Sequence, residues 1–171
     1  MNRSALEVRF KVNDRAVYPA HGVGQISAIE EQIIGSTSIE VYVINFAREK
    51  MTLRVPVKRA AACGLRPLAT KKQLEKVTEI LQGKAKNRRG MWSRKAQEFE
   101  AKINSGEIEQ IAEVVRDLWK NVEDPDRSYS ERVIYETALA RIASEFAAVY
   151  EITPEEASQR INDVLKEREI V

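Results

Sequence analysis

The hydrophobic residues between positions 12 and 67 occur in short runs separated by turn residues, a pattern that predicts strands rather than helices. These runs place four strands near residues 15–18, 22–30, 39–46 and 51–57. The GSTS segment between Ile34 and Ile39 has the composition of a hairpin loop, and REK before Met51 that of a tight turn. Four or five short strands within about 55 residues predict a small, strongly bent sheet or an SH3-like barrel.

After Leu68 the spacing of the hydrophobic residues becomes helical. Five residues stand where helix caps are expected, each before an apolar stripe: Thr70, Ser93, Ser105, Ser128 and Thr153. The strongest start is Thr153, because Pro154 and Glu156 follow it at the first and third helical positions. Trp119 and Val133 are expected to be buried with these stripes. Five helices joined mostly by short loops predict a compact bundle.

The chain is therefore predicted to have an α+β fold with two domains, a β-domain at 1–68 and an all-α helical domain at 69–171. The 43% hydrophobic content suffices for real cores. No run of about 18 apolar residues occurs, and the first residues lack the apolar block of a secretory signal. We expect a cytoplasmic protein without a membrane segment.

Charge is divided unevenly along the chain, although the net charge is only +2. Residues 1–68 carry 10 basic and 6 acidic side chains, residues 69–104 carry 10 and 4, and residues 105–171 carry 8 and 16. No acid stands between Glu79 and Glu98. Within that gap lies a basic segment, residues 84–95, with six positive side chains: Lys84, Lys86, Arg88, Arg89, Arg94 and Lys95. An anionic partner is the natural interpretation of this segment.

Trp92 lies inside the basic segment, next to the start of a predicted helix whose free amides favour phosphate. Apolar side chains exposed among basic ones are typical of proteins that bind the DNA minor groove. The alternative is a solvated basic loop with the tryptophan folded back against its own helix. The sequence leaves both interpretations open.

Residues with catalytic or metal-binding potential are few. His21 in the PAHG turn is interpreted as a surface turn residue, and Cys63 as a small buried apolar residue. One cysteine and one histidine cannot form a disulfide or the usual zinc ligand sets. No phosphate-binding glycine loop or nucleophile elbow occurs. We predict no enzymatic activity, no metal and no cofactor.

The segment MTLRVPV, residues 51–57, is an apolar strand interrupted by Thr52 and Arg54. It is either a buried strand of the β-domain or an edge strand that extends the sheet of another protein. In the second case Arg54 would pair with a carboxylate of that partner. The spacing alone does not separate these two interpretations.

Several motifs together resemble the CarD/CdnL family in order and approximate spacing. They are VYPAHGVGQI at 17–26, TLRVPV at 52–57, MWSRK at 91–95, SGE at 105–107 and EVVRDLW at 113–119. The resemblance spans nearly the whole chain. It implies a Tudor-like N-terminal domain that binds the β subunit of bacterial RNA polymerase, followed by a helical domain that binds promoter DNA at the upstream edge of the melted region.

The resemblance also implies roles for single residues. Arg54 matches the family's polymerase-contacting arginine, and we add its strand neighbours as polymerase-binding residues: Met51, Thr52, Leu53 and Pro56. Trp92 matches a wedge in the minor groove and Arg94 a phosphate contact. Lys86, Arg88, Arg89 and Lys95 are assigned to DNA from their position only. Some members carry an arginine where this chain has Gln32, and a lysine where it has Gln97.

The function expected from these features is stabilisation of the open promoter complex by a monomeric regulator, with little sequence specificity and no chemical step. A tethered DNA-binding domain works at high effective concentration, so weak affinity for DNA alone is expected. The alternative function is that of a protein–protein adaptor whose basic loop binds RNA or an acidic protein, without a promoter role.

Overall fold

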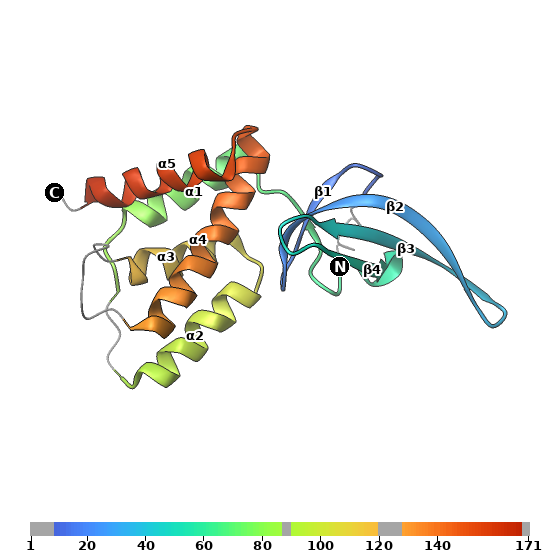
Figure 1. Cartoon of the computed structure of the whole chain (residues 1–171), viewed down its shortest axis with the longest axis horizontal. Coiled ribbons are helices and arrows are strands. Elements are labelled where there is room, and N and C mark those ends of the chain that lie inside the picture. Colours follow the sequence, from blue (N-terminus) through green and yellow to red (C-terminus); the bar gives the residue numbers. More distant parts are fainter. Residues whose placement is uncertain (1–8, 87–89, 120–127, 169–171) are drawn as a thin grey trace, which may run out of the picture. The chain divides into compact units, whose positions relative to one another are not determined.

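A computed structural model describes residues 9–86, 90–119 and 128–168 of the chain (Figure 1). The chain divides into two compact units, Met1–Leu68 and Ala69–Val171. The first is a β-sheet unit and the second a helical unit, so the fold is α+β as predicted. Each unit has its own hydrophobic core.

From residue 9 on, where its description begins, the N-terminal unit forms a five-stranded antiparallel sheet. Its strands are β1 (Arg15–Tyr18), β2 (Gly22–Ile34), β3 (Thr37–Phe46), β4 (Met51–Pro56) and β5 (Arg66–Pro67). They are ordered β4-β3-β2-β1-β5, so β4 and β5 form the two edges. The turn before Met51 is present at the predicted place, closed by a bond from the backbone N of Lys50 to the carbonyl of Ala47 (3.3 Å). The short strand β5 was not predicted from the sequence.

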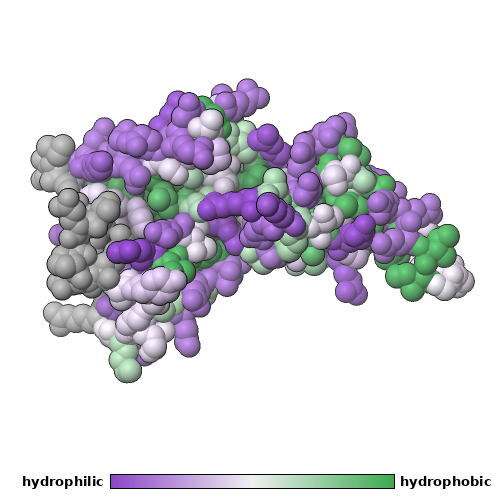
Figure 2. All heavy atoms as spheres, viewed as in Figure 1, coloured by the Kyte–Doolittle hydropathy of each residue, from purple (hydrophilic) through white to green (hydrophobic). Residues whose placement is uncertain are grey.

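The β2–β3 hairpin is longer than the sequence pattern predicts. Ile34 pairs directly with Thr37, so the connection is a two-residue turn and not a four-residue loop. Gly35 adopts φ +63° at the first turn position, which a two-residue turn of the II′ type requires. The tip leaves Ile33 78% and Ile34 63% exposed, and hydrophobic surface gathers at the far end of this hairpin in Figure 2.

The core of the N-terminal unit lies on one face of the sheet. Alternate residues of β3 point into it, namely Tyr42, Ile44 and Phe46, because side chains of a strand alternate between faces. Gly24 of β2 packs against them, since a Cβ at this position would lie 2.6 Å from Cγ2 of Ile44. Cys63 does not join this core. It is exposed, so the prediction of a buried cysteine is wrong: the chain turns on the surface after the 3-10 helix η1 (Val57–Arg59).

In the described part of the C-terminal unit there are five helices: α1 (Lys71–Gln82), α2 (Trp92–Asn104), α3 (Ile108–Leu118), α4 (Tyr129–Tyr150) and α5 (Pro154–Glu167). The apolar stripe predicted after Thr70 is buried in α1, through Leu74, Val77 and Leu81. Val133 is 41% exposed, because Ile134, one position on, takes the inward-facing place on α4. Trp119 is only half-buried, at the residue where α3 ends.

Three of the five predicted caps are confirmed. Thr70 and Thr153 form capping boxes with Gln73 and Glu156, and the hydroxyl of Ser128 accepts from the backbone N of Glu131 (3.1 Å).

The other two predicted caps, Ser93 and Ser105, are wrong. Helix α2 begins at Trp92, one residue before Ser93, with Met91 as a cap that contributes no side-chain bond. Ser105 stands at the end of α2, where its hydroxyl donates to the carbonyl of Lys102 (2.6 Å). Glu107 precedes α3 in its place.

Candidate functional site

Trp92 is the first residue of α2 and is half-buried. Its ring packs against Phe99 with 6.3 Å between centroids, and its indole Nε1 donates to Oγ of Ser130 (3.3 Å) in the first turn of α4. The bond joins residues that are 38 positions apart and brings the N-termini of two helices together. The sequence left open whether Trp92 is exposed or folded back against its own helix. In the structure it is partly folded back, and part of its side chain stays exposed.

Two exposed side chains at these helix starts are not marked by any pattern in the sequence. Met91 is 77% exposed directly before α2, and Tyr129 is 83% exposed at the first position of α4. We refer to Met91, Trp92, Tyr129 and Ser130 as the aromatic patch. No local signal in the sequence marks Tyr129, because its proximity to Trp92 depends on how α2 and α4 pack.

Arg94 and Lys95 follow Trp92 in α2, and two further basic residues, Lys84 and Lys86, follow the end of α1. Lys84, Lys86 and Arg94 are exposed, and Lys95 is half-buried. Among the described residues, none of these four forms an ion pair. The first turn of α2 contains no acid and its cap provides no side-chain acceptor, so its amides are available to an anion. Arg88 and Arg89, predicted to bind DNA, lie outside the described residues; Gln97 is exposed on α2.

The MTLRVPV segment forms an edge strand within the described structure, because β4 pairs only with β3. Thr52 and Arg54 are exposed on one face. Met51 and Leu53 alternate with them and pack against the core, so these two predicted contact residues turn their side chains to the inner face. Of the two interpretations of this strand, the edge position is the one observed.

Arg54 lies beside a carboxylate of its own sheet. Its Nε is 3.7 Å from Oε2 of Glu30, and both side chains are about half exposed, at 53% and 47%. An ion pair this exposed contributes about 0 to 1 kcal/mol. The guanidinium can therefore exchange Glu30 for a partner's carboxylate at little cost. Gln32 lies further along β2, opposite Ile39.

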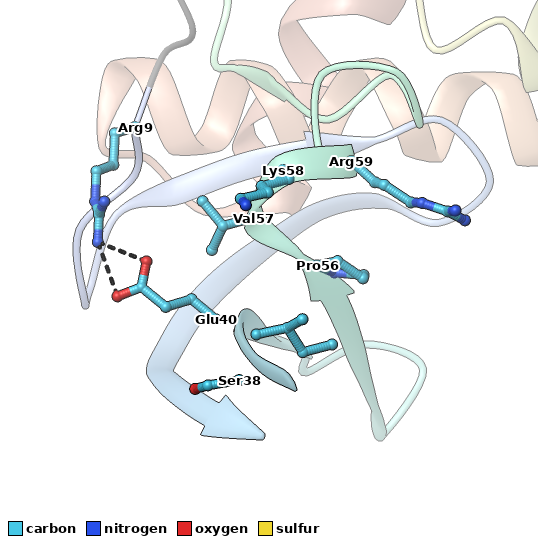
Figure 3. Close-up of a pocket in the computed structure, with 8 residues that line it drawn as sticks. Arg9, Ser38, Glu40, Pro56, Val57, Lys58 and Arg59 are labelled. Carbon is cyan, nitrogen blue, oxygen red and sulfur yellow. Dashed lines mark hydrogen bonds and ion pairs between the residues drawn. The ribbon is translucent and has the colours of Figure 1, made fainter. Parts of the chain in front are cut away.

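A groove of about 610 Å³ lies where β4 ends (Figure 3). It is lined by Arg9, by residues 38–40 of β3 and by residues 56–59. Pro56 is the last residue of β4 and pairs with Val41, so no described strand covers β3 beyond that point. Nη2 of Arg9 binds Glu40 (3.1 Å), whereas Lys58 and Arg59 are exposed. The N-terminal unit thus offers an open strand edge with net positive charge.

The remaining candidates from the sequence show no catalytic arrangement. Nδ1 of His21 lies 2.9 Å from Oε2 of Glu49, and its ring stacks on Tyr18 with 5.8 Å between centroids. This pair ties two surface turns together. Over the described ranges, no group of three metal-ligating side chains occurs, and no helix is long and apolar enough to cross a membrane.

Comparison with known proteins accounts for both units. Residues 10–69 match the CarD-like/TRCF RID domain, and residues 76–162 match the C-terminal domain of CarD. The chain belongs to the CarD family. It is also 31% identical over 144 residues to the "Putative transcription factor YdeB" of Bacillus subtilis (strain 168), a match that covers 84% of this chain and 94% of that protein.

Membership in the CarD family confirms the resemblance that the motifs indicated. CarD proteins are transcription factors without enzymatic activity, and the RID domain is their RNA polymerase-interacting domain. The β-sheet unit is thus the polymerase-interacting half of the chain, and the helical unit is the CarD C-terminal half.

Proposed function

We propose that this CarD protein binds the β subunit of RNA polymerase through β4 and promoter DNA through the aromatic patch and the basic segment, and thereby stabilises the open complex. The single observation that carries the DNA half is the junction of α2 and α4. There an indole, a phenol and a methionine side chain lie at the N-terminus of α2, whose first turn contains no acid, and exposed Arg94 and half-buried Lys95 follow in the same helix.

This combination suits the edge of a melted promoter. Apolar and aromatic side chains can insert next to an unstacked base step, while basic side chains and free amides contact phosphates. None of these groups reads a base edge in the major groove, so we expect little sequence specificity. The protein would act as a monomer, brought to promoters in the cytoplasm by the polymerase.

The polymerase half rests on Arg54 and on the open edge of the sheet. A partner strand can add to an exposed edge through backbone hydrogen bonds, while side chains beside it select the partner. Arg54 and Thr52 project from β4, and Lys58 and Arg59 follow it. A polymerase segment that is extended and acidic would match this surface. Leu53 and Met51 would support it from the core side.

Co-purification with polymerase, followed by promoter-opening kinetics, tests both halves together. We expect the chain to retain the β subunit and to lengthen the lifetime of the open complex without changing the initial binding of polymerase to the promoter. Retention of polymerase without any change in the lifetime of the open complex would contradict the proposed action on promoter DNA. A salt-resistant complex with RNA would favour the adaptor function instead.

A further inference from the structure

Asp117, in the last turn of α3, has a side chain that is only 2% exposed. Its Oδ1 accepts hydrogen bonds from Nε of Arg116 (2.8 Å) and from the backbone N of Lys86 (3.0 Å). Lys86 lies 31 positions earlier in the chain, in the basic segment. A carboxylate buried in the helical unit thus holds the backbone of a surface segment.

The chain just before Lys86 is held in a similar way. Nη1 of Arg168 donates to the carbonyls of Gly83 and Arg116, both at 3.1 Å. Its guanidinium also lies over the ring of Trp119, 5.3 Å from the centroid. Gly83 ends α1, and residues 84–86 have no regular secondary structure. The backbone after α1 no longer makes helical hydrogen bonds. Asp117 of α3 and Arg168, which follows α5, bind it instead, at Lys86 and Gly83.

Burial of a carboxylate is costly unless charged and hydrogen-bonded partners satisfy it. Asp117 meets that requirement with one guanidinium and one backbone amide. The amide belongs to Lys86, which lies at the surface together with Lys84. Fixing the backbone at this point limits where both ammonium groups can reach, and so reduces the entropy lost when they bind phosphates.

We propose that Asp117 is a positioning residue of the DNA-binding surface: its carboxylate holds the backbone of Lys86 so that Lys84 and Lys86 are preorganised toward phosphates. The proposal rests on the proposed DNA-binding function. Asp117 would touch no nucleic acid itself and would act through Lys84 and Lys86.

The decisive measurement is amide hydrogen exchange at Lys86 in the full chain, combined with the salt dependence of DNA binding. In Asp117→Leu the Lys86 amide should exchange about 10- to 100-fold faster, the change expected when a hydrogen bond to a charged group is removed. The slope of log K against log salt should become shallower by about 0.9 for each phosphate that the variant no longer neutralises. Asp117→Asn keeps an oxygen acceptor, so its Lys86 exchange rate and its salt slope should both lie closer to those of the unmodified chain than the values for Asp117→Leu.

Two comparisons separate positioning from general stability. Glu145→Leu removes another buried carboxylate that holds a backbone amide, since Oε2 of Glu145 accepts from the N of Ala69 (2.7 Å). It should destabilise the helical unit without changing Lys86 exchange or the salt slope. Lys86→Pro removes the donor N–H from a surface position, so it leaves the core intact even if Asp117→Leu does not fold. Its affinity for DNA should fall below that of Lys86→Ala, which keeps the N–H.

Unchanged salt slope and affinity in Asp117→Leu, or equal affinities for Lys86→Pro and Lys86→Ala, would overturn the positioning role. Failure of the unmodified chain to bind DNA would overturn it together with the proposed function. Exchange at Lys86 is read without DNA, so that measurement still shows whether Asp117 holds the segment. The two failures can thus be told apart.

Discussion

The indole of Trp92 and the hydroxyl of Ser130 are joined by a hydrogen bond of 3.3 Å between the first turns of two helices. Trp92 belongs to a motif that is visible in the sequence, whereas Ser130 belongs to none. Their contact brings exposed Tyr129 to the same surface. Candidate DNA-binding residues therefore come from two helices rather than from one basic loop.

Replacing Trp92 by alanine should shorten the lifetime of the open promoter complex. Stacking between a base and an aromatic side chain contributes about 1 to 3 kcal/mol, which corresponds to about a 5- to 150-fold change. The lifetime of the open complex is measured from promoter-dissociation kinetics in the presence of the variant. Polymerase binding should stay intact, and Trp92→Phe should give an intermediate lifetime. An unchanged lifetime for Trp92→Ala would remove the wedge from the mechanism.

Tyr129→Ala should weaken DNA binding without lowering the thermal stability of the protein. The side chain is 83% exposed, so its loss creates no cavity in the core. Fluorescence anisotropy with a forked or bubble-containing duplex measures the affinity. Val133→Ala, about one turn further along α4 and 41% exposed, is the matched control and should bind like the unmodified chain. Equal affinities of Tyr129→Ala and the unmodified chain would exclude Tyr129 from the interface.

Arg54→Glu should abolish association with the β subunit while both units remain folded. The substitution places a carboxylate beside Glu30 on an exposed surface and repels an acidic partner. A pull-down with the isolated β subunit measures the effect. Arg15→Glu makes the same change of charge on β1, away from the β4 edge, and should leave binding near normal. Normal retention of the β subunit by Arg54→Glu would refute this interface.

Thr153→Ala should destabilise the helical unit by about 0.5 to 2 kcal/mol, because the hydroxyl of Thr153 accepts from the backbone N of Glu156 at the start of α5 (3.1 Å). The melting temperature should fall by about 4 to 8 °C for each kcal/mol. Calorimetry of the full chain measures this change. Thr153→Ser retains the acceptor, so its melting temperature should be close to that of the unmodified protein. Equal melting temperatures of the alanine and serine variants would show that the hydroxyl does not stabilise the helix.

Features that depend on neighbouring residues were predictable from the sequence. The strand at Arg15–Tyr18, the capping boxes at Thr70 and Thr153, and the change from β to α after Leu68 agree with the structure. Each depends on side-chain periodicity or on a hydrogen bond that spans three residues. The separation of charge along the chain is likewise a property of the sequence alone.

Features that depend on distant contacts were decided by the tertiary structure. Sequence could not say whether Arg54 lies on a central or an edge strand, since strand order joins segments far apart in the chain. Cys63 and Val133 have local surroundings typical of buried residues, yet both are exposed. The bond of Asp117 to Lys86 spans 31 positions. Local propensity therefore determined which elements form, and packing between them determined which side chains are available to a partner.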